Sequence, residues 1–521
     1  MSAPGLNVPA REALDALADA LSGRPYVLSL SHSDSFHKLG GTEKVIVEQQ
    51  RLLADRGVGH VQASVFATGR QPMPARPGDQ LLVVNVDAQR AGVFSAGLLA
   101  AVLRRLARDA GAGCRAVHLH HMLHWAPGAV ETLLDAAAAP VRFFVHDYHT
   151  ICPQFRLLRN DRTYCGGPEP DSELCRTCKY GPARQAHWPT MRRLFGRGNI
   201  EPVAPSQAAA EVWLGSYPEY RGRVRVVPHL LRQRLAADDA DRARRLRDPG
   251  YRPRLAFVGY EHPAKGWDAW QRVMLDRRIA AAYDLHILGH CRFCPPHVQL
   301  AEVSFVDQGL DAMVRALQDR RIDLAVLWSI WPETYSYTLQ EALAANCYVL
   351  TTAASGNIAD QVRREGRGCV LPDAAALVRL LRQGKALRNA AADGLAAAGP
   401  ETLTSNPATA DRVAVAGDPP APPDAAGLEA ALNEQAESSR RRRQRLGYLA
   451  GEGDDAAAPL HRTANLPGLV RRGVGLARRL VPRPARRAAA ALARRYVALS
   501  VAWARSLYAA RRLAKTLAAR R

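Results

Sequence analysis

The run Trp331-Pro332-Glu333-Thr334-Tyr335-Ser336-Tyr337-Thr338-Leu339-Gln340-Glu341-Ala342 combines the end of a strand, a loop and the start of a helix. An apolar, strand-like stretch, 323–328, precedes it, and the residues from Tyr337 onward favour a helix. Carboxylates at Glu333 and Glu341 can accept hydrogen bonds from sugar hydroxyls, while the backbone N–H groups at the helix start can face phosphate oxygens. Taken alone, the same residues would also suit a helix cap followed by one solvated glutamate.

Outward from this run, short apolar segments alternate with helical patterns, which indicates parallel sheets joined by crossover helices. The strands expected in the first half are 26–30, 60–66, 81–86, 116–120, 141–146, 203–205 and 224–227. Those expected in the second half are 255–259, 285–288, 303–306, 324–327, 348–351 and 369–371. We therefore predict an α/β fold with two doubly wound, Rossmann-like domains, at 1–232 and 253–395. The polar, charged stretch 234–253 is the expected irregular hinge.

Beyond these domains the composition changes twice. Residues 396–427 are rich in Ala, Pro, Asp and Thr and predict a linker, and 428–521 predict a helical tail. The segment 440–521 holds 21 Lys and Arg against three acids, so it carries +18 of the chain's net charge of +22. The rest of the chain therefore carries only +4, which argues against a nucleic-acid-binding body.

The bulk composition is that of a globular protein. The 521 residues are 47% hydrophobic and 23% charged, which is enough for two or three domains with full cores. The first 24 residues lack an export-signal pattern, and no apolar stretch is long enough to span a bilayer. With nine cysteines, an odd number, the sequence favours reduced thiols and a cytoplasmic location.

Three further motifs lie at expected strand ends. Gly40-Gly41 precedes an amphipathic helix at 45–54, where glycines allow the backbone to approach a phosphate. Gly259 ends a strand and Lys265-Gly266 follows it, so that the lysine can reach a diphosphate. His146 closes another apolar strand, where a side chain in an open α/β sheet lies at the ligand crevice or serves as a capped core histidine.

Together these features resemble the retaining, nucleotide-sugar-dependent glycosyltransferases of family 4, which have the GT-B fold, with two Rossmann-like domains facing across a cleft. The resemblance covers roughly 26–373 and rests on Pro332-Glu333-Thr334 to Glu341-Ala342, Val258-Gly259 to Lys265-Gly266, Val203-Ala204-Pro205-Ser206, and Gly40-Gly41. It implies a transferase of the EC 2.4 class that acts without a catalytic metal and retains the anomeric configuration.

The resemblance also implies the site. The expected catalytic residues are His146, Lys265 and Glu333; the expected donor-binding residues are Gly40, Gly41, Gly259, Lys265, Glu333, Thr334, Tyr335, Ser336 and Glu341. By the same resemblance, Glu333 contacts the donor sugar, Glu341 holds the ribose and Lys265 neutralises the diphosphate. The family often has an arginine just after the strand-ending glycine, whereas Tyr260, Glu261 and His262 follow Gly259 here; Arg292 is a candidate substitute.

A separate feature is the insertion at 152–181, which carries Cys152, Cys165, Cys175 and Cys178. Four thiolates can close a tetrahedral structural zinc site, and a metal would order a segment with little apolar content. Four unlinked thiols are the alternative. Insertions of this kind look like those in bacterial members of the family that build surface polysaccharides. The second C-x-x-C, Cys291 and Cys294, predicts loop packing instead.

The end of the tail forms an amphipathic pattern. From Leu492 onward one helical stripe carries the residues Tyr496, Leu499, Trp503, Leu507, Leu513 and Leu517, and arginines dominate the other face. This pattern favours a helix lying on an anionic membrane surface. We therefore expect a peripheral enzyme at the inner face of the plasma membrane, acting on a lipid-linked or envelope glycan such as lipopolysaccharide.

Other classes of function stay open at this point. The same fold could serve a nucleotide-sugar epimerase or a sugar-binding protein without transfer activity, and the basic tail could bind nucleic acid. The tail's few aromatics lie mostly on the apolar stripe instead of among the arginines, which disfavours nucleic acid.

Overall fold

The structure is a computed structural model of the whole chain. It describes residues 15–411 except 16, 18, 22, 37–39, 67–73, 75, 108–112, 236–238, 293 and 305–307. The predictions for 412–427 of the linker and for the tail at 428–521 lie outside these residues. Among the helices that are described, none is long and apolar enough to cross a membrane.

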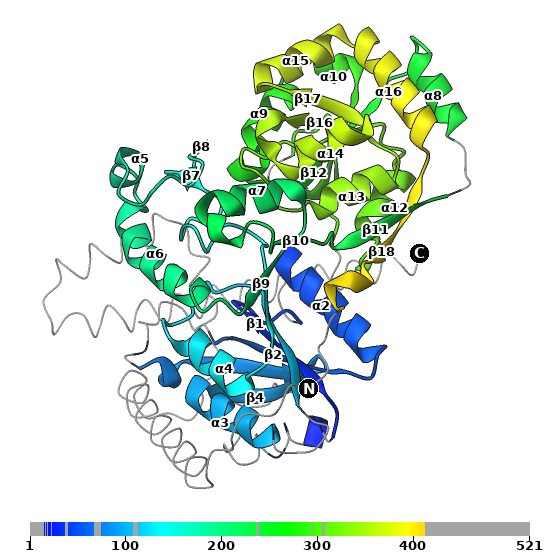
Figure 1. Cartoon of the computed structure of the whole chain (residues 1–521). Coiled ribbons are helices and arrows are strands. Elements are labelled where there is room, and N and C mark those ends of the chain that lie inside the picture. Colours follow the sequence, from blue (N-terminus) through cyan, green and yellow to red (C-terminus); the bar gives the residue numbers. More distant parts are fainter. Residues whose placement is uncertain are drawn as a thin grey trace, which may run out of the picture. The chain divides into compact units, whose positions relative to one another are not determined.

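The first domain is built on a sheet in the order β10-β9-β6-β5-β1-β2-β3-β4 (Figure 1). Its strands are β1 (Tyr26–Ser31), β2 (Gly59–Val65), β3 (Leu81–Val86), β4 (Gln89–Ser95), β5 (Cys114–Leu119), β6 (Val141–Phe144), β9 (Ile200–Ala204) and β10 (Arg225–Val226). All neighbours are parallel except the pairs β2–β3 and β3–β4. The central strands are buried along their whole length and mostly apolar, as expected for a parallel sheet covered on both faces.

Helices connect these strands. They are α2 (Gly41–Ala54), α3 (Ala96–Leu106), α4 (Ala129–Ala137), α6 (Gly181–Phe195) and α7 (Gln207–Ser216), with short 3-10 turns η1 (Pro77–Asp79) and η2 (Pro218–Tyr220). Ser95 and Ser206 begin α3 and α7 by accepting backbone N–H groups on their side chains. The insertion after β6 holds the hairpin β7 (Leu158–Arg159) and β8 (Thr163–Tyr164) and the four-residue helix α5 (Glu173–Arg176).

The second domain is a fully parallel six-stranded sheet in the order β14-β13-β12-β15-β16-β17. Its strands are β12 (Arg254–Tyr260), β13 (Asp284–His290), β14 (Val298–Ala301), β15 (Leu324–Val326), β16 (Tyr348–Thr352) and β17 (Gly368–Leu371). Its helices and turns are η3 (Pro263–Lys265), α9 (Trp267–Met274), α10 (Arg277–Ala282), α12 (Ala312–Asp319), α13 (Tyr337–Ala344), η4 (Ala353–Ser355), α14 (Asn357–Glu365), α15 (Ala374–Gln383) and α16 (Lys385–Ala398). Separate buried clusters cover the two faces of this sheet.

Both sheets contain a switch point, where the strand order reverses and ligands bind at the carboxyl ends of the strands. In the first sheet β1 lies between β2 and β5, and in the second β12 lies between β13 and β15. The loop after β12 carries Lys265, and the loop after β15 carries Glu333. The predicted donor motif therefore lies at the switch point of the second sheet.

Two boundaries and one strand differ from the sequence prediction. The stretch 234–253 is not an irregular hinge, since it contains α8 (Ala240–Arg247), which packs on α16. Arg242 of α8 is buried and pairs with the fully buried Asp323, which a count of charges along the sequence cannot reveal. The strand expected at 303–306 lies earlier, at β14, and Val303 and Ser304 lie outside it.

The predicted linker at 396–427 also begins later than expected. The residues after α16 form β18 (Glu401–Ser405), which pairs antiparallel with β11 (Leu230–Arg234), followed by the turn η5 (Pro407–Thr409) (Figure 1). The chain then returns to the first domain: Ala410 is buried beside Val27 and Leu53, and the Thr409 carbonyl accepts a hydrogen bond from Gln49. The Ala- and Pro-rich composition of this stretch gives no indication that the chain returns to the first domain.

The residues at the carboxyl ends of the two sheets contact one another. Tyr148, which follows β6, donates its hydroxyl hydrogen to the Pro332 carbonyl at 2.9 Å, and Ser206 donates to the Thr334 carbonyl at 2.7 Å. The described residues thus form two doubly wound α/β domains whose ligand-binding edges meet. This confirms the predicted α/β, GT-B fold class; the tail in that prediction lies outside the described residues.

Candidate active site

Glu333 lies in the loop between β15 and α13. Its backbone is fixed by two hydrogen bonds, from its own N–H to the Ser355 carbonyl and from the Asn357 N–H to its carbonyl. Gly356 allows this arrangement, because a Cβ there would lie 2.5 Å from the Pro332 Cα. The loop is therefore held in place before any ligand binds, with the Glu333 side chain only 5% exposed.

Lys265 ends the turn η3, and the next residue, Gly266, explains its position. Gly266 has φ +80°, and a Cβ there would lie 2.0 Å from the Trp328 carbonyl oxygen. Only glycine lets the chain pass this close to the end of β15. The Lys-Gly pair of the sequence thus brings Lys265 next to the loop that carries Glu333.

The two side chains form an ion pair, with Lys265 Nζ 2.7 Å from Glu333 Oε1. Burial alone would lower the pKa of Lys265, but the Glu333 carboxylate holds that pKa above its ordinary value. Lys265 is therefore a permanent cation at neutral pH. It is also 31% exposed, so its ammonium can be reached by a ligand.

Glu341 lies inside α13 and is paired with a residue of the first domain. Its Oε1 is 3.2 Å from the Nζ of Lys44, and both side chains are at most 8% exposed. Burial raises the pKa of Glu341, an effect that Lys44 opposes. Lys44 also lies 4.2 Å from the centre of the Tyr337 ring. Sequence analysis did not single out Lys44, since a lysine early in an amphipathic helix usually faces solvent.

The Gly40-Gly41 motif begins α2, the helix that carries Lys44. A Cβ on Gly41 would lie 3.9 Å from the Tyr337 ring of α13, and one on Gly40 would lie 2.6 Å from the Glu43 carboxylate. A Cβ on Gly41 would thus make only ordinary contact with Tyr337, whereas one on Gly40 would meet the Glu43 carboxylate of α2 itself. One turn further along α2, Glu48 accepts a hydrogen bond from the Tyr337 hydroxyl at 3.0 Å, and burial raises the pKa of Glu48 to about 7.

His146 is half-buried beside a group of buried histidines at the end of the first sheet. Its Nε2 lies 2.9 Å from Nδ1 of His120, and its ring centre is 5.6 Å from that of His229. Burial, followed by the charge of His229, lowers the pKa of His146 well below the ordinary value. His146 is therefore neutral at physiological pH, suited to a hydrogen bond with a sugar hydroxyl and unsuited to a cationic role.

Of the three residues after Glu333, the first two hold the loop against the first domain and the third begins α13. Thr334 donates its hydroxyl hydrogen to the His146 carbonyl at 2.6 Å, and the Tyr335 hydroxyl accepts the Leu230 N–H at 3.1 Å. Ser336 caps α13 by accepting the Leu339 N–H at 3.2 Å. Their predicted contact with a donor stays a prediction, and the structure adds a role in joining the donor loop to His146.

Gly259 occupies the end of β12 with φ +134°, and no atom lies within 4 Å of the position of a Cβ. The turn that carries Lys265 follows this strand in the sequence. Arg292, the predicted substitute for the missing arginine, is exposed, and its backbone N–H donates to Glu261. Arg156 of the insertion is a second candidate, because its positive charge opposes protonation of both Lys265 and His262.

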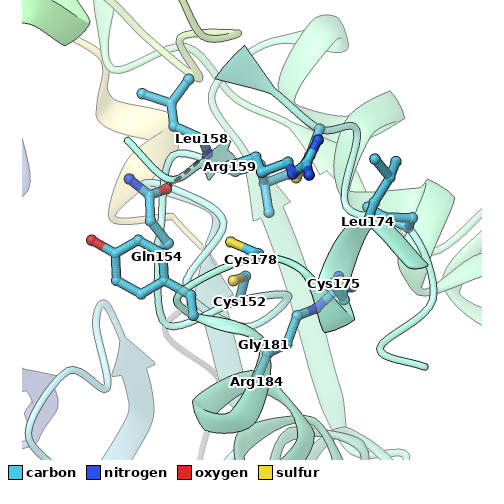
Figure 2. A pocket seen from close by; sticks show the side chains of 13 residues that line it. Cys152, Gln154, Leu158, Arg159, Leu174, Cys175, Cys178, Gly181 and Arg184 are labelled. Carbon is cyan, nitrogen blue, oxygen red and sulfur yellow. Dashed lines mark hydrogen bonds between the residues drawn. The ribbon is translucent and has the colours of Figure 1, made fainter. Parts of the chain in front are cut away.

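The four cysteines of the insertion come together from three segments. Cys152, Cys165, Cys175 and Cys178 line one pocket, where Figure 2 shows Cys152 and Cys178 beside one another and Cys175 on α5. All four are free thiols. As the side chains stand, the described residues contain no group of three or more His, Cys, Asp or Glu in a metal-binding arrangement.

Comparison with known proteins gives a similarity to solved structures only. No protein-family profile matches the chain, and no curated protein sequence matches it. A crystal structure of Anabaena HepE with UDP and glucose aligns at 12% identity and a TM-score of 0.41, covering 80% of this chain and 99% of HepE.

Two further structures align in the same way. WaaG, a glycosyltransferase involved in lipopolysaccharide biosynthesis, aligns at 13% identity and a TM-score of 0.40, covering 71% of this chain and 94% of WaaG. A glycosyltransferase from Rickettsia africae aligns at 12% identity and a TM-score of 0.41, covering 80% of this chain and 99% of its own. Similarities this distant carry no argument about activity, so the site must be judged on its own residues.

Proposed function

We propose that this protein transfers a sugar from a nucleoside-diphosphate sugar to a hydroxyl acceptor, with retention of the anomeric configuration. The observation that carries the proposal is the buried Glu333 carboxylate held by Lys265 at the switch point of the second sheet. A carboxylate suits sugar hydroxyls and an adjacent ammonium suits a diphosphate. Gly259, with no atom within 4 Å of a Cβ position, lies in the strand that precedes the Lys265 turn.

In this proposal each charged group binds a different part of the donor. Lys265 turns from Glu333 to the diphosphate, and Glu333 then accepts hydrogen bonds from hydroxyls of the donor sugar. Glu341 accepts hydrogen bonds from the ribose while it remains near Lys44. His146, kept neutral by burial, donates or accepts a hydrogen bond at the sugar ring.

The chemical step breaks the bond between the anomeric carbon and the diphosphate oxygen. The electron pair leaves with the diphosphate, whose growing negative charge Lys265 stabilises from a fixed position. The acceptor oxygen bonds to the anomeric carbon on the same face, and the acceptor proton passes to the departing phosphate oxygen. A lysine in this place supplies the charge that a metal ion supplies in other enzymes, so we propose that transfer needs no metal.

We further propose that the acceptor is a lipid-linked or envelope glycan and that the enzyme works at the inner face of the plasma membrane. The support is the cationic, amphipathic pattern of the tail, which lies outside the described residues. Co-sedimentation with anionic vesicles, compared with binding to random duplex DNA at moderate salt, tests this part. Binding to DNA without binding to vesicles would contradict it.

Sugar transfer itself is tested with Lys265→Ala and Glu333→Ala in the full chain. Each substitution should lower transfer from the nucleotide sugar by roughly 100-fold or more, while the far-ultraviolet circular dichroism and melting transition show a folded protein. Transfer at the wild-type rate in both variants would remove the proposal. A product in which the donor sugar is rearranged but not transferred would instead identify a nucleotide-sugar epimerase.

A further inference from the structure

The insertion that carries the four cysteines has almost no hydrophobic core of its own. None of the residues from Arg159 to Leu174 is buried, the hairpin β7–β8 has two residues in each strand, and α5 has four residues. A segment of this kind cannot be ordered by burial of apolar surface. Polar contacts such as those of Asp161 with Gln154, Lys179 and Tyr180 hold its parts together, and a cross-link would add to them.

The cysteine positions fit a cross-link between the parts of this insertion. Cys152 lies where the chain leaves the sheet, Cys165 follows the hairpin with its N–H bonded to the Leu157 carbonyl, and Cys175 and Cys178 lie in and after α5. The turn between the last two is closed by a hydrogen bond from the Cys178 N–H to the Cys175 carbonyl. All four nevertheless line one pocket (Figure 2).

Arg184 places a buried positive charge beside the cysteines of this pocket. Its side chain is 2% exposed, and its Nη1 lies 2.8 Å from Cys175 Sγ. The other guanidinium nitrogens donate to the carbonyls of Ile151 and Gly167, and within the described residues Arg184 forms no salt bridge with a carboxylate. The guanidinium thus adds a positive charge beside the cysteine sulfurs, and a site of four thiolates would compensate it.

We propose that Cys152, Cys165, Cys175 and Cys178 bind one structural zinc ion as four thiolates. Zinc favours four tetrahedral sulfur ligands, and a C-x-x-C pair with two further cysteines is a common ligand set. Four Zn–S bonds form and four thiol protons are released to solvent, with no change of oxidation state.

Among the described residues the thiols do not stand in a metal-binding arrangement, and Cys175 is turned toward the Arg184 guanidinium. Binding of zinc therefore requires the cysteine side chains around this pocket to rotate toward one another. The Arg184 N–H can then remain as a hydrogen bond to a zinc-bound sulfur.

The experiment uses the full chain, purified under reducing conditions after growth with zinc. Elemental analysis should find about one zinc per chain, and Cys178→Ser should reduce this at least tenfold. The matched control is the double variant Cys291→Ser and Cys294→Ser, which removes the other C-x-x-C and should keep the zinc.

A second measurement does not depend on the variants folding. Zinc in the wild-type chain should protect Cys152, Cys165, Cys175 and Cys178 from alkylation, as read by mass spectrometry, and a chelator should expose them. Replacement of zinc by cobalt should give an intense sulfur-to-cobalt charge-transfer absorption, as expected for tetrahedral thiolate ligands. Absence of bound metal, iron in place of zinc, or equal alkylation with and without a chelator would overturn the proposal.

Discussion

Lys44 Nζ and Glu341 Oε1 lie 3.2 Å apart, joining a helix of the first domain to the helix that follows the donor loop of the second. Both side chains are buried, so each compensates the charge of the other, and Lys44 also acts on the Glu48 carboxyl. The residue proposed to hold the ribose is therefore also part of a contact between domains. Donor binding at Glu341 and the contact of α2 with α13 depend on the same carboxylate.

Loss of Lys44 should be costly because it leaves a buried carboxylate without its cation. We expect Lys44→Met to lower the free energy of unfolding by roughly 3–5 kcal/mol, as is usual when one partner of a buried ion pair is removed. The double variant Lys44→Met with Glu341→Gln should regain a large part of that loss. Urea denaturation of the four proteins measures this, and strictly additive effects would show that the pair is not coupled.

Removal of Lys265 should weaken catalysis far more than it weakens folding. Lys265→Ala should lower kcat/KM for the donor by roughly 100- to 1,000-fold, the usual effect of losing one group that stabilises a developing charge. Lys385→Ala, which removes an exposed lysine at the start of α16, is the control and should keep full activity. Equal kinetics for the two variants would exclude Lys265 from the diphosphate site.

The cation that replaces the missing arginine can be identified by comparing two substitutions. Arg156→Ala should weaken donor affinity about tenfold, equal to about 1.4 kcal/mol, because its charge acts on Lys265 and His262. Arg292→Ala should have little effect, and so should Arg162→Ala, an exposed arginine of the same insertion. Titration calorimetry of each variant with the donor decides between the two arginines. Weaker donor binding with Arg292→Ala alone would identify Arg292 as the substituting cation.

Glu48 predicts a dependence of stability on pH. Burial raises its pKa from 4.5 to about 7, so the folded protein keeps the carboxyl protonated where the unfolded chain does not. The resulting stability is complete below pH 4.5 and is lost as the pH rises through 7. Relative to Glu48→Gln, the wild type should lose roughly 2–3 kcal/mol over this interval. A constant difference between pH 4.5 and 8 would contradict the assigned pKa.

Gly266 should tolerate no side chain. Gly266→Ala combines a positive φ with a Cβ 2.0 Å from the Trp328 carbonyl, so we expect a loss of roughly 3 kcal/mol or more. Gly222 is a matched control, with φ +82° and open space around it, and Gly222→Ala should cost only about 1–2 kcal/mol. Thermal unfolding of both variants measures the difference in stability. Equal losses of stability would mean that the chain moves away from Trp328 without a cost in free energy.

The sequence predicted the elements that depend on local pattern. Buried strands such as β1 and β12 were recognisable as apolar runs, and the strand–loop–helix pattern around Glu333 placed it beside the Lys265 turn. Contacts between distant segments were not recognisable. Lys44 and Glu341 are 297 residues apart, and a lysine in an amphipathic helix carries no sign that it is buried.

The other differences between the sequence prediction and the structure also arise from contacts between distant segments. In the sequence Arg242 is one of several charged residues in 234–253. Only the fold brings it next to Asp323. Similarly, β18 is recognisable only through its pairing with β11, because its own residues alternate between intermediate and exposed positions. These features depend on pairing between strands far apart in the sequence and on burial of charged side chains. No local sequence pattern indicates either.

The central claim is that Lys265, Glu333 and Glu341 bind a nucleoside-diphosphate sugar. Its most direct test is titration calorimetry of the full chain with a panel of uridine, guanosine, adenosine and thymidine diphosphate sugars. We predict that at least one sugar nucleotide binds with a 1:1 stoichiometry, and that Lys265→Ala and Glu341→Ala each weaken its binding at least tenfold. No binding across the panel, or binding that is unchanged in both variants, would contradict the claim.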